Sequence, residues 1–228
     1  MGYIIFRGVQ SDTIGLMIEK MPSHKRAEMR HTEYEIPGRD GALHIVEGYA
    51  AFDLQVTVFM LNAEASLRQM VNAWASGTGD LVVSDDLTKC YRASALKEIT
   101  YTRRKYGGKY YDTAKITFRC QPFMYEAVPK VYTFTKSGNI VNLGNFPSLP
   151  LITVTGSGDC SFSIGGQSVT LTGVSSPVTL DCEAGYAYTE NGAVSMTGSF
   201  PEIGLADQTI EMNDKITKIE IKGNWRWL

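Results

Sequence analysis

Few residues of this 228-residue chain have a type and spacing that would support catalysis. There is no Gly-x-Ser-x-Gly nucleophile elbow, no Walker phosphate loop and no Gly-x-Gly-x-x-Gly segment after a strand pattern. Asp85 and Asp86 are adjacent, and neighbouring residues of a strand point to opposite faces, so this pair cannot flank one glycosidic bond. We therefore predict a protein that is not an enzyme, with no catalytic residue and no cofactor.

The three histidines, His24, His31 and His44, lie near the start of the chain. His24, Glu28 and His31 would gather around a metal ion if this stretch were helical. Pro22 and the strand character of residues 32–35 argue against a helix, and no further ligand follows at a useful spacing. The sequence thus predicts no metal site.

The four cysteines are widely separated, and no two of them form a CxxC pair. Three lie in strand-like runs, where a free cysteine acts as a small buried hydrophobic residue. We favour buried free thiols over a disulfide or a zinc site, because synthesis in a cytoplasm is expected. These residues are Cys90, Cys120, Cys160 and Cys182.

The segment Pro37-Gly38-Arg39-Asp40-Gly41 places one cation beside one anion between two glycines. Proline fixes its own φ, and glycine permits the positive φ that other residues resist, so a tight and stiff turn is predicted. By residue type alone the simplest interpretation is a structural turn. A charged contact for a partner is the alternative.

Two further surfaces could bind a ligand. Aromatic residues of the second half could stack on sugar rings, although core packing of a small β-sandwich is the favoured interpretation. These are Tyr186, Tyr188, Trp225 and Trp227. The basic run Arg103–Lys105 could touch phosphate, although a solvated loop is favoured.

Composition excludes several classes of protein. The net charge of −2 gives no basic excess for specific nucleic-acid binding, and no apolar run approaches the length of a membrane span. The start of the chain lacks the basic and apolar regions of a signal peptide. Apolar content of 43% with 20% charged residues is ordinary for a globular protein.

The pattern of the first half predicts strands and one helix. Residues 52–60 alternate apolar and polar side chains, which is typical of a strand. The period then becomes helical, with Asn62 as candidate cap and Gly77 as candidate terminator. The apolar stripe of this helix consists of Leu67, Met70, Val71 and Trp74.

Hairpins and a domain boundary account for most of the remaining chain. One hairpin is predicted with arms near 95–102 and 113–120 and with Arg103–Lys105 and Gly107-Gly108 at its tip. The prolines at 122 and 129 indicate a boundary between two β domains. Beyond it, a two-residue turn at Gly165-Gly166 would place Phe162 opposite Val169 and Cys160 opposite Leu171.

Short motifs occur in an order that is more specific than any one of them. They are Phe6-Arg7-Gly8-Val9, Gly15-Leu16, Pro37-Gly38-Arg39-Asp40-Gly41, the strand at 52–60 with the Trp74 helix, Ser84-Asp85-Asp86, Phe118-Arg119-Cys120-Gln121-Pro122-Phe123, Gly144-Asn145 with Pro147 and Pro150, Asp181-Cys182-Glu183, Gly198-Ser199-Phe200-Pro201 and Trp225-Arg226-Trp227. Over nearly its full length the chain resembles the distal tail protein (Dit) family of long-tailed, non-contractile bacteriophages and their prophages.

The resemblance implies a structural protein of the virion, located at the tail tip or baseplate and assembled in the bacterial cytoplasm. Family members form a hexameric ring that joins the tail tube protein to tail-tip proteins and lets DNA pass. The implied fold is mainly β: residues 1–127 form a tail-tube-like, ring-forming β-sandwich with one α-helix, and residues 128–228 form a galectin-like or carbohydrate-module-like β-sandwich.

The resemblance also bears on the candidate sites. Because a ring subunit needs complementary surfaces and this turn is stiff and charged, we hypothesise that Pro37, Gly38, Arg39, Asp40 and Gly41 lie at or near a ring contact, where charges fix orientation more than affinity. The chain looks like a short member, without the long arm or inserted sugar-binding modules of some relatives, which weakens the case for sugar contact. A carbohydrate-binding adhesion module that contacts the host cell wall remains the alternative function.

Overall fold

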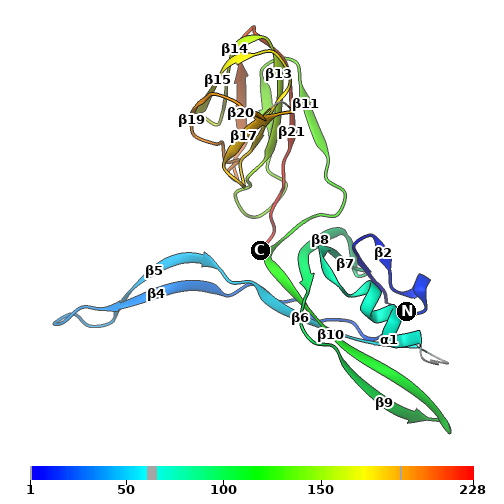
Figure 1. Ribbon diagram of the computed structural model, residues 1–228. Helices are drawn as coiled ribbons and strands as arrows, with labels where there is room; N and C mark the ends of the chain where they lie inside the picture. The colour runs from blue at the N-terminus through cyan, green and yellow to red at the C-terminus, as the bar shows by residue number, and fades with distance from the viewer. Residues whose placement is uncertain (1, 61–65, 191) are drawn as a thin grey trace. The chain divides into compact units, whose positions relative to one another are not determined.

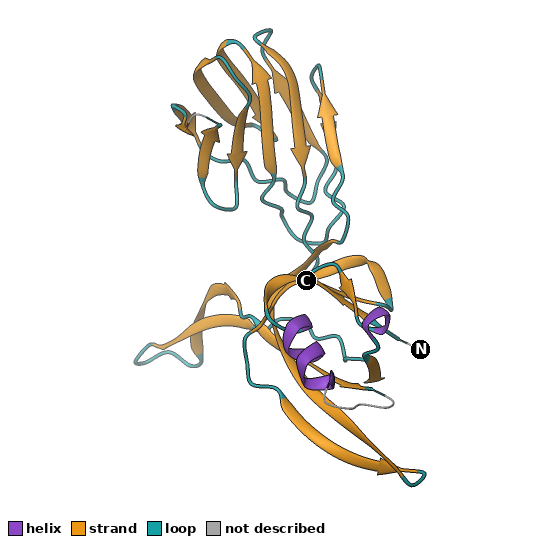
Figure 2. Ribbon diagram, turned by 45° about the vertical axis from the view of Figure 1, so that its right-hand side comes forward, coloured by secondary structure: helices purple, strands orange, loops and turns teal. Residues whose placement is uncertain are grey.

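The computed structural model describes residues 2–60, 66–190 and 192–228. By contacts the chain divides into unit 1, which comprises Met1–Ala127 with Leu228, and unit 2, which comprises Val128–Trp227. The described residues are mainly β with one α-helix (Figures 1 and 2), so the predicted fold class is confirmed.

Unit 1 is built on one large antiparallel sheet. Its eight strands run in the order β2-β1-β7-β8-β10-β6-β3, with β9 paired to β10, whereas β4 and β5 form a separate two-stranded sheet. The elements are β1 Ile4–Phe6, β2 Val9–Gln10, the 3-10 helix Asp12–Ile14, β3 Met17–Lys20, β4 Met29–Glu35, β5 Ala42–Tyr49, β6 Phe52–Phe59, α1 Ser66–Trp74, β7 Gly77–Val83, β8 Asp86–Ala95, β9 Thr100–Tyr106 and β10 Lys109–Glu126.

The predicted strand and helix in the middle of unit 1 are present. In β6, Leu54, Val56 and Val58 are buried on one face, as the alternating pattern requires. The helix α1 ends at Trp74, three residues before Gly77, which instead begins β7. The candidate cap Asn62 lies outside the described residues. In the described part of the chain no helix is long and apolar enough to cross a membrane.

An aromatic cluster joins α1 to the sheet. The rings of Phe6 and Phe118 lie 4.9 Å apart between centroids, and Trp74 contacts both of them edge-on. The Trp74 indole N–H donates to the carbonyl of Val9 at 2.9 Å, which satisfies its polar atom. The apolar stripe of the helix therefore packs on β1 and β10, which lie in the same sheet.

The strand β10 continues through Pro122, so this proline does not mark the boundary between the domains. It lies where the register with β8 shifts, between Cys120 and Met124. Proline has no N–H to donate, and an irregular point in a ladder is where a strand tolerates it. The strand ends at Glu126, next to the division between the two units.

Unit 2 is a sandwich of two antiparallel sheets. One has the order β11-β21-β13-β16-β17-β18, and the other β12-β20-β14-β15-β19. A cluster of buried aliphatic side chains from both sheets forms its core. The strands are β11 Val131–Phe134, β12 Gly138–Ile140, β13 Leu151–Gly156, β14 Gly158–Ile164, β15 Gln167–Val174, β16 Val178–Asp181, β17 Tyr186–Thr189, β18 Gly192–Ala193, β19 Met196–Gly198, β20 Gln208–Met212 and β21 Ile216–Lys222.

The predicted Gly165-Gly166 hairpin has the expected register. Phe162 pairs with Val169, and Cys160 pairs with Leu171. Both glycines have positive φ, of 56° and 81°, which is the backbone of a two-residue hairpin turn that matches strand twist.

The end of unit 2 is held by the segment that contains Gly144. The backbone N–H groups of Asn145 and Phe146 both donate to the carbonyl of Arg226. A Cβ atom on Gly144 would lie 2.3 Å from that same carbonyl oxygen, so only glycine allows this approach.

The close approach at Gly144 predicts a large effect of a single methyl group. Gly144→Ala should lower the free energy of unfolding by about 1–3 kcal/mol, since backbone atoms of Arg226 must move. Calorimetric unfolding would show this as a lower transition temperature. Gly204→Ala is the matched control, because its Cβ would meet only the movable amide nitrogen of Gln208 at 3.0 Å. Equal transition temperatures in the two variants would contradict the prediction.

Candidate functional site

The strands β4 and β5 form a two-stranded ribbon, residues 29–49, that pairs with no other strand in the described chain (Figure 1). The register runs from Met29 opposite Tyr49 to Glu35 opposite Ala42. The turn expected at Pro37–Gly41 lies at the tip of this ribbon, where the N–H of Arg39 donates to the carbonyl of Ile36 at 3.1 Å. The five predicted turn residues are thus together and exposed.

The two faces of the ribbon carry different side chains, and the face that we call polar bears His31, Glu33 and His44, with Val46 opposite His31. On the apolar face Tyr34 lies opposite Leu43, and Ile45 lies opposite Thr32. Tyr34, Leu43 and Ile45 are 51%, 44% and 49% exposed, although such side chains are normally buried when they occur together. Within the described residues these three side chains remain about half exposed on one face, and exposed apolar strips of this kind are candidate surfaces for a partner.

The base of the ribbon is fixed by hydrogen bonds and ion pairs. The backbone N–H of Ala50 donates to the backbone carbonyl of Glu28, and the Lys25 ammonium group donates to the backbone carbonyl of Asp53. Lys97 and Arg119 both pair with the Asp53 carboxylate. The hydrogen bond from Lys97, followed by that from Arg119, lowers the pKa of Asp53 against the opposing effect of burial.

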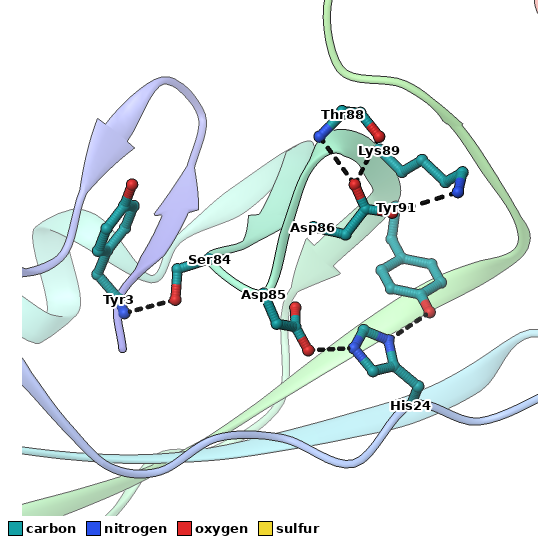
Figure 3. Close-up of polar contacts among 8 residues, drawn as sticks. All are labelled: Tyr3, His24, Ser84, Asp85, Asp86, Thr88, Lys89 and Tyr91. Carbon is teal, nitrogen blue, oxygen red and sulfur yellow. Dashed lines mark hydrogen bonds and ion pairs between the residues drawn. The ribbon is translucent and has the colours of Figure 1, made fainter. Parts of the chain in front are cut away.

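A second polar cluster joins the chain before the ribbon to the turn between β7 and β8 (Figure 3). His24 contacts the Asp85 carboxylate at 2.6 Å through Nε2 and the Tyr91 hydroxyl at 3.3 Å through Nδ1. The Ser84 hydroxyl accepts from the backbone N–H of Tyr3 at 3.0 Å. Asp85 lies in the turn predicted from Ser84-Asp85-Asp86.

The order Asp85–His24–Tyr91 has the form of a catalytic relay but not its chemistry. Burial raises the pKa of Tyr91 to about 12, so its hydroxyl keeps its proton and is a poor nucleophile. Asp86 faces a different set of partners, Thr88 and Lys89. The contacts are those of a structural tie that holds the segment leading into the ribbon against β8.

The basic residues predicted at a hairpin tip lie within strand β9. Arg103 pairs with Asp112 across the hairpin, and Arg104 pairs with Glu19 of β3. The Lys105 ammonium group lies 5.3 Å from the centre of the Tyr110 ring. Gly107 and Gly108 alone form the turn. These cations have partners within the chain, which lowers their value as a phosphate site.

The four aromatic residues proposed for sugar stacking do not form one surface. Trp225 is 0% exposed and packs against Tyr132, so its proposed role in stacking was wrong. Trp227 is half-buried against the same core. Tyr186 and Tyr188 are exposed side by side on β17, with ring centroids 5.3 Å apart. Burial of the large apolar area of Trp225 in the core is favourable, which explains why this residue is not on the surface.

All four cysteines are free and buried. Burial raises the pKa of Cys120 and of Cys182 to about 12, and it also raises that of Cys160. Thiols in this state are inert rather than reactive. The prediction of small buried hydrophobic residues is confirmed.

The histidines are divided between two places. His24 belongs to the tie with Asp85, and His31 lies on β4, so the considered group with Glu28 does not form. His31 instead lies close to Glu33 and His44 on the polar face of the ribbon. From the sequence, Glu33 and His44 were not grouped with His31, because their proximity depends on the register between β4 and β5.

The two units, with a ribbon projecting from the sheet of the first, have the fold of phage baseplate hub proteins. The chain superposes on the Dit protein (gp 19.1) of phage SPP1 with a TM-score of 0.74 and 16% identity, covering 97% of this chain and 98% of that one. That protein is described as a paradigm of the hub adsorption apparatus in Gram-positive infecting phages. The expected resemblance is confirmed at the level of the fold.

A second solved structure shows a more distant likeness. A chain of the phage P2 baseplate in its activated conformation with Ca has a TM-score of 0.51 and 8% identity, with 97% of each chain covered. No protein-family model and no curated protein matches the sequence. The comparison with solved structures therefore rests on shape.

The Asp53 cluster predicts a dependence of stability on pH. Because the folded state lowers the pKa of Asp53, its carboxylate stabilises folding above its ordinary pKa of about 3.9, and this contribution is lost as pH falls through the lowered value. Asp53→Asn should cost about 1 kcal/mol or less at pH 7, given the exposure of Lys97 and Arg119, and progressively less below about pH 4. Thermal unfolding of the wild type and of Asp53→Asn, at pH 7 and again below about pH 4, measures the difference in stability.

High salt provides the control for this prediction. Screening at 1 M NaCl should shrink the difference between wild type and Asp53→Asn at pH 7. A difference that grows as the pH is lowered would contradict the assigned direction of the pKa shift.

Proposed function

We propose that this chain is the distal hub protein of a bacteriophage tail, a structural component of the virion without enzymatic activity. The observation that carries the proposal is the match to SPP1 Dit, which includes nearly all of both chains and therefore both units. An isolated β-sandwich occurs in proteins of many functions, so a match that includes both units supports the proposal more than a match to unit 2 alone would.

In this proposal unit 1, residues 1–127, forms a hexameric ring and unit 2, residues 128–228, faces other virion proteins. A ring made by head-to-tail contacts needs two different complementary surfaces on each subunit. The apolar face of the ribbon is our candidate for one of them, because Tyr34, Leu43 and Ile45 remain about half exposed in the described part of the chain. The ring would join the tail tube protein to the tail-tip proteins.

The passage of DNA through the ring also fits the charges of the chain. The net charge is −2, and Arg103 and Arg104 are already paired with Asp112 and Glu19. A conduit must not retain the DNA that it carries, and a protein without basic excess has little electrostatic affinity for phosphate.

The alternative function, a carbohydrate-binding adhesion module, loses support from unit 2. Burial of Trp225 leaves Tyr186 and Tyr188 as the exposed aromatic pair among the residues considered for this role. The hub proposal needs no sugar site, so it is the one we favour.

The apolar face of the ribbon gives a direct test. Negative-stain images of the purified chain should show rings, and the double variant Leu43→Ser/Ile45→Ser should give folded monomers. Loss of two apolar side chains that become buried in the contact should weaken each contact by about 2 kcal/mol, or about 30-fold. Leu205→Ser, which changes an exposed leucine of unit 2, is the control and should retain rings. A wild-type chain that remains monomeric at high concentration would refute the ring.

The tip of the ribbon gives a second test. Arg39, Asp40, Glu33 and Glu35 line one open hollow there, which offers a neighbour both signs of charge. Arg39→Ala/Asp40→Ala should leave the monomer folded but reduce the hexamer fraction in size-exclusion light scattering, more strongly at low salt. Intact hexamers at micromolar concentration would show that the tip is not a ring contact.

A further inference from the structure

Three side chains on the polar face of the ribbon form a compact group of metal-binding atoms. His31, Glu33 and His44 each offer one ligand atom, and these atoms all lie within 4.8 Å of one another. The ligands of a tetrahedral zinc ion are about 3.4 Å apart, given bonds of about 2.0–2.1 Å. Small side-chain rotations would close this gap, since all three residues are exposed and lie at the surface of the ribbon.

The register of the ribbon explains why these residues meet. Glu33 lies directly opposite His44, and His31 is two residues before Glu33 on the same strand, so all three point to one face. The rings of His31 and His44 are 5.3 Å apart between centroids. The backbone ladder of β4 and β5 therefore holds the three Cβ atoms in place before any ion binds.

The hydrogen bond of His31 orients it as a ligand. Its Nδ1–H donates to the carbonyl of Met29 at 3.4 Å, and a carbonyl can only accept, so the proton of the neutral ring lies on Nδ1. The Nε2 atom then carries the free lone pair. Histidine ligands of metal sites commonly hold their second nitrogen in such a bond to a backbone carbonyl.

We propose that His31, Glu33 and His44 bind a divalent transition-metal ion, with Zn²⁺ as the best-fitting physiological ion. Two imidazole nitrogens with one carboxylate oxygen suit zinc, nickel or cobalt and do not suit Ca²⁺ or Mg²⁺, which prefer oxygen ligands throughout. With three protein ligands, a fourth position remains for water or for a donor from another molecule.

The site gives the ribbon a cross-link that its own packing lacks. The polar face bears no covering layer in the described chain, so the bound ion would tie β4 to β5 near the middle of their ladder. This inference does not depend on the proposed ring, because all three ligands come from one chain.

Metal binding to the untagged, chelator-treated protein tests the proposal. Calorimetric titration with ZnCl₂ should show uptake of about one ion per chain. His31→Ala and His44→Ala should each weaken binding at least tenfold. Removal of a residue that only supports a ligand already costs about 10–100-fold in metal affinity, so loss of a ligand itself should cost no less. Glu33→Gln should act in the same direction, and CoCl₂ should give the visible absorption of a site with nitrogen ligands.

Two matched variants make the result specific. His24→Ala removes a histidine that contacts Asp85, and Glu47→Gln removes a ribbon carboxylate that bonds to Thr32, so both should bind Zn²⁺ like the wild type. The proposal is overturned if the wild type takes up no Zn²⁺, or if His31→Ala and His44→Ala bind it unchanged. Equal affinity of the protein for Ca²⁺ and Zn²⁺ would also overturn it, since that would indicate binding to surface carboxylates and not to the histidines.

Discussion

The long strand β10 sets the geometry of unit 1 because it is shared by three partners. Along one side it pairs with β6, from Thr113 opposite Phe59 to Cys120 opposite Phe52. Along its other side it pairs first with β9 and then, from Arg119 onward, with β8, in a ladder whose register shifts near Pro122. The ladder places Asp53 directly opposite Arg119, so the ion pair at the base of the ribbon follows from the backbone register. The ribbon and the β9–β10 hairpin therefore both start from positions that one strand determines.

Elements whose information is local could be predicted from the sequence. The alternation in 52–60 describes β6 because one face of that strand is buried and the other is not. The spacing of Leu67, Val71 and Trp74 describes α1 for the same reason, with a period of 3.6 instead of two. The Gly165-Gly166 hairpin could even be given its register, since a two-residue turn leaves a single pairing of the strands.

Features that depend on distant partners could not be predicted. The run Arg103–Lys105 was expected at the tip of a hairpin, yet it lies in a strand because its backbone pairs with residues 110–112 of β10. The sequence pattern did not determine whether Trp225 is exposed or buried. Its indole packs against the ring of Tyr132, which is distant in the sequence. The group of His31, Glu33 and His44 needed the register of β4 and β5, which a six-residue connection does not fix by sequence.

The unpaired outer edges of the ribbon bear on the tendency of the chain to associate with copies of itself. Within the described chain β4 bonds only to β5, so each strand leaves a row of backbone N–H and C=O groups without a neighbouring strand. Open edges beside apolar side chains are where chains add to one another in unwanted sheets. The shift in register at Arg30 and His31 bends the ladder and makes such stacking less regular. The time that the chain spends with these edges uncovered therefore sets its exposure to self-association.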